Sequence, residues 1–431
     1  MPAPLQLNCL DSAARTAPVM GISEWMCYHA NYDIPCSGVS DLDACLDAHV
    51  ALGIDQIVWN AGRSVVDYWS DLPNVTRMCE LNDQAGGISW SFVAAVMDSV
   101  CPLRYALSYC RKRQIPLLGR LGMNRHYGST EYAGVTSRFA LENPHYRERS
   151  IRGNEVAQKL CYAIEEVQQE RLDILLEVQR IGVDALVLDF CRQMPILLYH
   201  DALIRPYIEM VGEDPRRIDS SIPEDYTRWF QYRADVLTEF MRKLRTAVHN
   251  QERTLGKSCP IIARIPDNAP WLTLAYGLDI ERWFADDLID GTMLSPFPIS
   301  APDPDRYPEY HIELAHRHGK VCYGGIGSRN LIQNGILENT GFFHPRPIYQ
   351  LALRQYNAGA DTMTLYQSET LVRMDYLKET LCEIGNRRRV AQKAADLPDP
   401  NFPPEHPIGL DWHSRLTGGH GLGLGAGDGA L

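Results

Sequence analysis

The chain has 431 residues, of which 45% are hydrophobic and 22% are charged, so its composition is that of a globular protein with a large core. Its 42 basic and 54 acidic residues give a formal net charge of -12, which argues against a nucleic acid or an anionic membrane surface as a partner. No apolar stretch approaches the roughly 18 residues of a membrane span, and no secretory leader is recognisable, so we expect a soluble, cytoplasmic protein.

The twelve cysteines show neither Cys-x-x-Cys spacing nor the Cys and His spacing of a zinc finger. Most lie in apolar segments, so we expect buried free thiols. A metal-dependent barrel of the amidohydrolase kind needs a His-x-His pair after its first strand, and the segment from Glu24 to His29 has none. We therefore predict neither a metal site nor a cofactor.

The first short apolar segment, residues 19–23, is predicted to be a strand, and a helix capped by Ser40 leads from it to the next one. That helix ends in a Gly-apolar-Asp join at Gly53, and equivalent joins recur at Gly182 and Gly359. The repeated join indicates one helix–strand unit used several times, with a left-handed glycine at the helix end. Segments with this rhythm predict eight strands, at residues 19–23, 56–60, 115–120, 185–188, 260–265, 291–294, 320–323 and 362–366.

Eight strands that alternate with helices are the number that a closed (β/α)8 TIM barrel needs, and we predict this α/β fold for residues 1–390. A doubly wound open sheet is the alternative, but no Gly-x-Gly-x-x-Gly turn follows the first strand. Two long βα loops, residues 61–101 and 190–221, are expected to form the site. Residues 391–431 contain a proline-rich stretch and then a glycine-rich one, so we expect an extended or disordered C-terminal tail.

The fourth predicted strand carries the residue on which the functional hypothesis depends. Its run from Ala185 to Leu188 is continuously apolar, as in a parallel strand covered on both faces, and Asp189 follows directly. Burying an unpaired carboxylate is costly, so we expect Asp189 to face a cleft at the C-terminal end of the barrel. The alternative is a structural carboxylate that pairs with Arg264 or Arg120.

Other strand ends present further carboxylates among aromatic and hydrogen-bonding side chains, a mixture that suits sugars. Glycoside hydrolysis needs two carboxyl groups, one neutral and one ionised. The candidate catalytic residues are the strand-end carboxylates Asp189, Asp267, Glu24 and Glu369. Asp267 is the preferred partner of Asp189, and the capping of a turn is its alternative role. The candidate substrate-binding residues are polar or aromatic: Trp25, Asn60, Arg63, Arg120, Asn124, His126, Arg192, Arg264, Tyr323 and Tyr366.

Three segments resemble motifs of a family of uncharacterised glycoside-hydrolase-like TIM barrels. Gly182–Arg192 is similar to the fourth-strand motif of that family, VDG-apolar-x-LDF-x-R. Arg120–His126 is similar to its Arg-Met-Asn-Asp-x-His segment after the third strand, and Ala263–Asp267 to its Arg-Val-Pro segment after the fifth. The resemblance spans roughly residues 19–385.

The resemblance implies a glycosidase in which Asp189 stands where alpha-amylase-like and alpha-galactosidase-like barrels, which are more distantly similar, keep their nucleophile. The chain departs from the family pattern at Ala185, where the usual residue is Gly, and at Arg125, where it is Asp. The fourth strand also lacks the Asp-x-Asp-x-Glu of chitinase-like barrels, which disfavours a substrate-assisted mechanism.

The hypothesis that follows is a glycoside hydrolase with a carbohydrate substrate. Two alternatives stay open at this point. One is a barrel that binds carbohydrate without cleaving it, and the other is a lyase or isomerase that grips a sugar acid with Arg120, Arg192 and His126. The sequence leaves the sugar, the stereochemical outcome and a homo-oligomeric state undecided.

Overall fold

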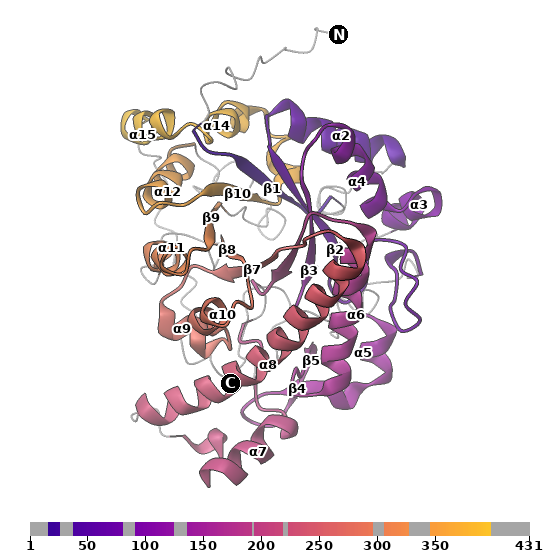
Figure 1. Cartoon of the computed structure of the whole chain (residues 1–431), viewed down its shortest axis with the longest axis vertical. Coiled ribbons are helices and arrows are strands. Elements are labelled where there is room, and N and C mark those ends of the chain that lie inside the picture. Colours follow the sequence, from indigo (N-terminus) through magenta and orange to yellow (C-terminus); the bar gives the residue numbers. More distant parts are fainter. Residues whose placement is uncertain are drawn as a thin grey trace.

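In the computed structural model, eight parallel strands close into a barrel that is surrounded by helices (Figure 1). The structure describes residues 16–25, 38–80, 91–124, 136–191, 194–218, 223–295, 306–326 and 345–397. The strands follow the order β1, β10, β9, β8, β7, β6, β3, β2, and β2 pairs with β1 to close the ring. The (β/α)8 barrel predicted from the sequence is therefore confirmed.

The barrel strands are short and lie close to their predicted positions. They are β1 Val19–Ser23, β2 Gln56–Gly62, β3 Leu117–Gly122, β6 Ala185–Asp189, β7 Ile261–Pro266, β8 Gly291–Ser295, β9 Val321–Ile326 and β10 Thr362–Tyr366. Strands β2 and β9 continue further than the sequence predicted, which matters for the placement of site residues below. An antiparallel hairpin of β4 Arg147–Arg149 and β5 Glu155–Leu160 lies between β3 and the helix that follows.

Helices cover the outside of the barrel and contribute to its βα loops. They are α2 Val39–Ala51, α3 Ser91–Ser99, α4 Pro102–Lys112, α5 Arg138–Glu142, α6 Glu165–Ile181, α7 Asp201–Val211, α8 Pro223–Leu255, α9 Pro270–Ala275, α10 Ile280–Ala285, α11 Pro308–Arg317, α12 Pro345–Asn357, α13 Ser368–Leu371, α14 Lys378–Glu383 and α15 Arg387–Asp396. None of the helices in these ranges has both the length and the apolar character that crossing a membrane requires.

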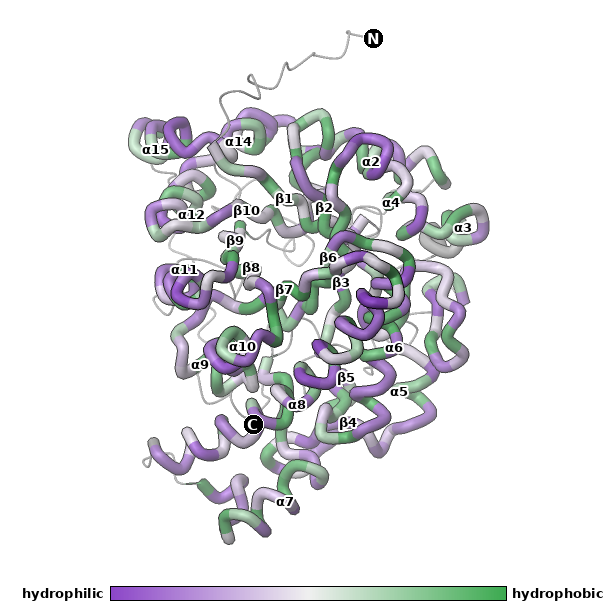
Figure 2. The backbone as a smooth tube through the Cα atoms, in the orientation of Figure 1, coloured by the Kyte–Doolittle hydropathy of each residue, from purple (hydrophilic) through white to green (hydrophobic). Residues whose placement is uncertain are grey.

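Two hydrophobic cores hold the barrel together. The larger core fills the space between the strands and the helices, and a smaller one fills the barrel interior. Strand β6 serves both, because Ala185 and Val187 face the interior while Leu186 and Leu188 face the helices. In Figure 2 green segments lie mainly on the central strands, and purple segments gather on the surrounding helices. The continuous apolar run of β6 thus has the cause predicted for it, since both of its faces are buried.

The backbone conformation of the glycine and the hydrogen bond of the aspartate explain the three Gly-apolar-Asp joins. Gly53, Gly182 and Gly359 all have positive φ, at 68°, 103° and 101°, which is the left-handed conformation that favours glycine. The aspartate of each join accepts a backbone N–H at the start of a neighbouring strand. The bonds are Val19 N to Asp55 Oδ2 at 2.8 Å, Leu117 N to Asp184 Oδ2 at 2.9 Å and Cys322 N to Asp361 Oδ2 at 2.8 Å. The joins therefore tie adjacent strands together at the N-terminal end of the barrel.

The predicted tail begins later than expected. Helix α15 continues through Asp396, so residues 391–396 are helical rather than extended, because Val390 and Ala394 are buried where α15 packs against α12. The rest of the predicted tail, from residue 398, lies outside the described residues. The nine cysteines within the described ranges are all free thiols, and seven of them are buried, as predicted.

The joins lead to a stability prediction for Asp184→Ala. This change leaves the N–H of Leu117 without its acceptor, so we expect the free energy of unfolding to fall by about 1–3 kcal/mol. Its ion pair with Lys257 adds little, because both side chains are about 40% exposed. Urea unfolding followed by circular dichroism measures the change, with the exposed Asp98→Ala as the control. Equal midpoints for Asp184→Ala and Asp98→Ala would contradict this role.

Candidate functional site

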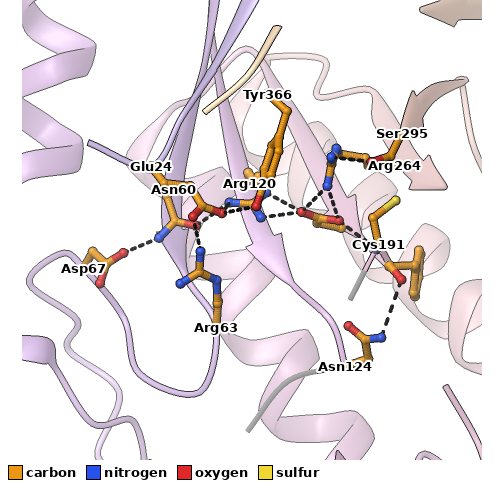
Figure 3. A network of polar contacts seen from close by, with 12 residues as sticks. Glu24, Asn60, Arg63, Asp67, Arg120, Asn124, Cys191, Arg264, Ser295 and Tyr366 are labelled. Carbon is orange, nitrogen blue, oxygen red and sulfur yellow. Dashed lines mark hydrogen bonds and ion pairs between the residues drawn. The ribbon is translucent and has the colours of Figure 1, made fainter. Parts of the chain in front are cut away.

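Side chains at the C-terminal end of the barrel form one polar layer, which we call the C-terminal layer (Figure 3). Along each strand, alternate residues face the barrel axis, so Asp189 follows the interior residue Val187, and Arg264 follows Ile262. All members except Arg63 are buried. The layer consists of Glu24, Asn60, Arg63, Asp67, Arg120, Asp189, Arg264, Ser295 and Tyr366.

Asp189 ends strand β6 and is held by two guanidinium groups. Arg120 Nε donates to Asp189 Oδ2 at 2.6 Å, and Arg264 Nη1 lies 2.9 Å from both carboxylate oxygens. The backbone N–H of Cys191 donates to Oδ1 at 2.8 Å. Burial alone would raise the pKa of this carboxyl, but Arg120 and Arg264 outweigh burial and lower its pKa to about 2. Asp189 is therefore ionised throughout the physiological range.

Glu24 follows strand β1 and continues the network on the other side of Arg120. Its Oε1 accepts from Arg120 Nη1 at 2.6 Å and from the hydroxyl of Tyr366 at 3.0 Å, while its Oε2 contacts Arg63 Nη2. Arg120 thus lies between two carboxylates and also donates to Asn60 Oδ1 at 2.9 Å. Positive and negative charges alternate across the barrel, which compensates the desolvation of each buried ion.

Tyr366 and Ser295 complete the layer around Arg264. The guanidinium of Arg264 lies 4.2 Å from the ring centroid of Tyr366, at cation–π distance. Arg264 Nη2 donates to Ser295 Oγ at 2.6 Å. Strands β10 and β8 therefore fix the orientation of the guanidinium that holds Asp189.

Asp67 is a carboxyl group of the layer with one oxygen that has no hydrogen-bond partner among the described residues. The loop after β2 folds back, with a bridge between Gly62 and Val66 and a bond from Asp67 N to Ala61 O at 2.9 Å. This places Asp67 Oδ2 against the amide of Asn60, whereas Oδ1 is buried with no hydrogen-bond partner among the described residues. Burial raises its pKa to about 7, against the opposing charge of Arg63. A large fraction of Asp67 is therefore protonated near neutral pH.

Glu369 is also buried and carries a raised pKa, but it lies behind the layer. Its helix, α13, packs against β1 and α2. Glu369 Oε2 accepts from Glu24 N at 2.9 Å, and Oε1 has no partner within the described part of the chain. Burial and, after it, the charge of the nearby Glu24 raise its pKa to about 8. Glu369 therefore supports Glu24 from the outer side of β1.

Asp267, the predicted partner of Asp189, is buried and follows the end of β7 directly. Its backbone N–H bonds Ser295 O at 3.1 Å, its carbonyl accepts from Tyr307 N at 2.7 Å, and its charge acts on Arg354 of α12. These backbone bonds suit a residue of a turn, and the catalytic role of Asp267 stays a prediction.

Two aromatic candidates are displaced from the layer. Trp25 is 2% exposed and stacks on Trp59, with ring centroids 6.2 Å apart, so it belongs to the core around the barrel. Tyr323 was expected at a strand end, but β9 continues to Ile326. Burial and the charges of Asp361 and Asp290, which precede strands β10 and β8, raise the pKa of its hydroxyl, and Tyr323 pairs with Thr362 at the start of β10. Tyr323 therefore faces the N-terminal half of the barrel.

Of the remaining candidates, Asn124 lies beside the layer, where its Nδ2 is 3.5 Å from the carbonyl oxygen of Phe190. His126 and Arg192 fall outside the described residues. The candidate residues predicted from the sequence do not include Asp67 and Ser295. The fold-back at Gly62, where an added Cβ would come within 2.5 Å of Val65 O, is the local signal for Asp67.

No family model and no curated protein matches the sequence. Among solved structures, the chain is similar to trehalose-6-phosphate hydrolase from Bacillus licheniformis, with 12% identity and a TM-score of 0.42, covering 84% of this chain and 66% of that one. It is similar to an alpha-galactosidase from Thermus thermophilus, with 13% identity and a TM-score of 0.40, covering 86% and 62%. For the glycoside hydrolase domain of PelA from Pseudomonas aeruginosa the identity is 11%, the TM-score 0.42 and the coverage 82% and 96%.

The chain spans 66% and 62% of the first two of these proteins. At such identities the similarity concerns the barrel architecture. The chemistry of this chain therefore has to be inferred from the C-terminal layer itself.

The raised pKa of Glu369 leads to a prediction about stability and pH. Its carboxyl keeps a proton in the folded state up to about pH 8, whereas the unfolded chain releases it near the ordinary value of 4.5. The proton on Glu369 therefore contributes fully to the free energy of unfolding below pH 4.5, and this contribution is lost as the pH rises through 8. Within that window the wild type should lose about 1.4 kcal/mol of its free energy of unfolding per pH unit because of Glu369. We expect Glu369→Gln, which imitates the protonated carboxyl, not to show this loss.

Urea unfolding of Glu369→Gln and wild type at several pH values measures this slope. The exposed Glu209→Gln on α7 is the control and is expected to follow the wild type. A Glu369→Gln protein that lost stability toward pH 8 as steeply as the wild type would show that Glu369 ionises normally in the folded chain.

Proposed function

We propose that the protein is a glycoside hydrolase that cleaves a glycosidic bond at the C-terminal end of the barrel. The observation that carries the proposal is the division of protonation states within one layer. Asp189 is held ionised by two arginines, whereas the buried Asp67 has its pKa raised to about 7. Carboxyl groups whose environments separate their pKa values supply the ionised group and the proton donor that this reaction needs.

In this proposal Asp67 is the general acid. Its Oδ1 carries the proton to the glycosidic oxygen while the bond from that oxygen to the anomeric carbon breaks. The ionised Asp189 stabilises the positive charge that develops on the sugar ring, as a nucleophile or as a fixed anion. Water then supplies the hydroxyl group at the anomeric carbon, and its other proton returns to Asp67.

A second candidate function, carbohydrate binding without cleavage, is favoured by the surroundings of Asp189. This residue is 2% exposed, and both of its oxygens already accept hydrogen bonds. Such a carboxylate stays ionised. An oxygen that attacks a sugar, however, must first give up a hydrogen bond that it accepts. In that case the C-terminal layer would form a rigid surface that contacts the carbohydrate.

The sugar-acid lyase or isomerase is less well supported. It requires Arg120 to grip the carboxylate of a substrate. All three guanidinium nitrogens of Arg120 already contact Glu24, Asn60 or Asp189. Four of its five N–H donors are therefore already used, and the one that is left cannot hold a second carboxylate in a bidentate manner.

The acid role of Asp67 is tested by the leaving group of the substrate. We expect Asp67→Asn to lower kcat about 10²–10⁴-fold for glycosides with a poor leaving group. It should have little effect on dinitrophenyl glycosides, because their leaving group departs without a proton. In the wild type, activity should fall as the pH rises through about 7, and this limb should disappear in the variant.

Asp71→Asn is the matched control, because Asp71 is exposed and lies in the same loop. A leaving-group effect in Asp267→Asn, and not in Asp67→Asn, would transfer the acid role to Asp267. Heat of binding in calorimetry with no product from any glycoside, in the wild type, would instead establish the second candidate.

A further inference from the structure

A cavity of about 270 Å³ is lined by residues of helices α8, α9, α10 and α11 and of the segment between α9 and α10, outside the barrel. Figure 1 shows where these helices lie. Helix α9 starts just after β7, so the cavity lies on the flank of the barrel close to its C-terminal end. None of its lining residues belongs to the C-terminal layer. We call it the flank cavity, and the proposed hydrolytic chemistry does not use it.

His311 on α11 lines the flank cavity and carries an unsatisfied hydrogen-bond acceptor. It is 2% exposed, and its Nε2 lies 2.8 Å from the carbonyl oxygen of Asn268, so Nε2 carries the hydrogen. Burial lowers its pKa to about 4, so the ring is neutral at physiological pH and Nδ1 presents a lone pair. This Nδ1 is buried and has no hydrogen-bond partner among the residues that the structure describes. An O–H or N–H group of a ligand would satisfy it.

Aromatic rings form another part of the cavity wall. Trp271 on α9 is 50% exposed although it lines the cavity, and Tyr310 on α11 also lines it. The ring of Tyr310 packs edge-on against His311, with centroids 5.4 Å apart. An exposed indole beside a buried acceptor offers one apolar face and one polar contact to the same small molecule.

The remaining polar groups restrict the chemistry of the ligand. Asp279 and Glu281 line the cavity and disfavour an anion such as phosphate. Each oxygen of Asp279 already accepts one hydrogen bond, from Arg282 N at 3.1 Å and from Gln231 Nε2 at 3.0 Å, which weakens the attraction of this carboxylate for a cation. A purely apolar ligand would leave His311 Nδ1 unpaired. The walls therefore suit a neutral molecule with an apolar face and hydroxyl donors.

From these contacts we propose that the flank cavity is a carbohydrate-binding subsite that holds one pyranose residue. The C–H face of the sugar stacks on Trp271, and one of its hydroxyl groups donates to His311 Nδ1. The volume is slightly below the range of about 300–1,000 Å³ typical of ligand pockets, which suits a single sugar unit. The subsite goes beyond the proposed hydrolysis, because binding there requires no bond cleavage.

The position of the flank cavity links it to the barrel. Asn268, whose carbonyl holds His311, directly follows Asp267, whose N–H bonds the carbonyl of Ser295 at the end of β8. One short segment after β7 therefore contacts both the wall of the flank cavity and the C-terminal layer. A sugar chain held in the cavity would be anchored beside the barrel end.

Indole ¹⁵N–¹H NMR spectra of the full chain test the proposal. The signal of Trp271 is identified by its absence in Trp271→Phe. The probes are the methyl glycosides of glucose, galactose and mannose in both anomeric forms. At least one of them should shift the Trp271 signal in a saturable manner. Trp69 is the internal control, because it is 42% exposed and its indole N–H bonds Met97 O at 2.7 Å, away from the cavity.

Two variants of His311 test the acceptor. His311→Phe keeps an aromatic ring against Tyr310 but removes Nδ1, and we expect it to weaken binding about tenfold. His311→Gln retains a donor for Asn268 and an acceptor for the sugar, so its affinity should stay within about threefold of the wild type.

The proposal is overturned if no glycoside shifts the Trp271 signal, or if His311→Phe binds the shifting glycoside as tightly as the wild type does. It is also overturned if methylammonium shifts Trp271 and the sugars do not, because the ligand would then be a cation. Repeating the titration with Asp67→Asn keeps this test separate from hydrolysis. A Trp271 shift in that variant supports the subsite even if no glycoside is ever cleaved.

Discussion

A buried charge has to be neutralised by its neighbours, and this requirement organises the C-terminal end of the barrel. Interior positions of a small barrel are usually filled with apolar side chains. Here the apolar interior gives way at its C-terminal end to Arg63, Glu24, Arg120, Asp189 and Arg264, in which the charges alternate. Each ion is compensated by the next, and the strands that carry them must close in the correct order for the alternation to exist.

The same neutralisation sets the protonation states that the chemistry needs. Asp189 contacts two guanidinium groups and remains ionised at any physiological pH. Asp67 and Glu369 are as deeply buried but have weaker compensation, so their pKa values rise to about 7 and about 8. The number of arginines that reach a buried carboxyl therefore separates the ionised group from the proton donors. The structural network and the proposed catalytic apparatus consist of the same residues.

Strand β7 and the segment after it connect the two binding regions inferred here. Arg264 points into the C-terminal layer, and Asn268, beyond the end of the strand, receives the hydrogen bond of His311 in the flank cavity. One short stretch thus contacts two regions, through the side chain of Arg264 and the backbone carbonyl of Asn268.

The sequence by itself determined the barrel, because the Gly-apolar-Asp joins and the short apolar runs are local patterns with local causes. It also placed Asp189, Arg120 and Arg264 together, since the C-terminal ends of parallel strands meet at one end of a barrel. Only the tertiary structure decided the partners of Asp189. Asp67 enters the layer through a loop that folds back on β2. Such contacts depend on atoms far apart in the chain, and so does the pKa of every carboxyl group that they surround.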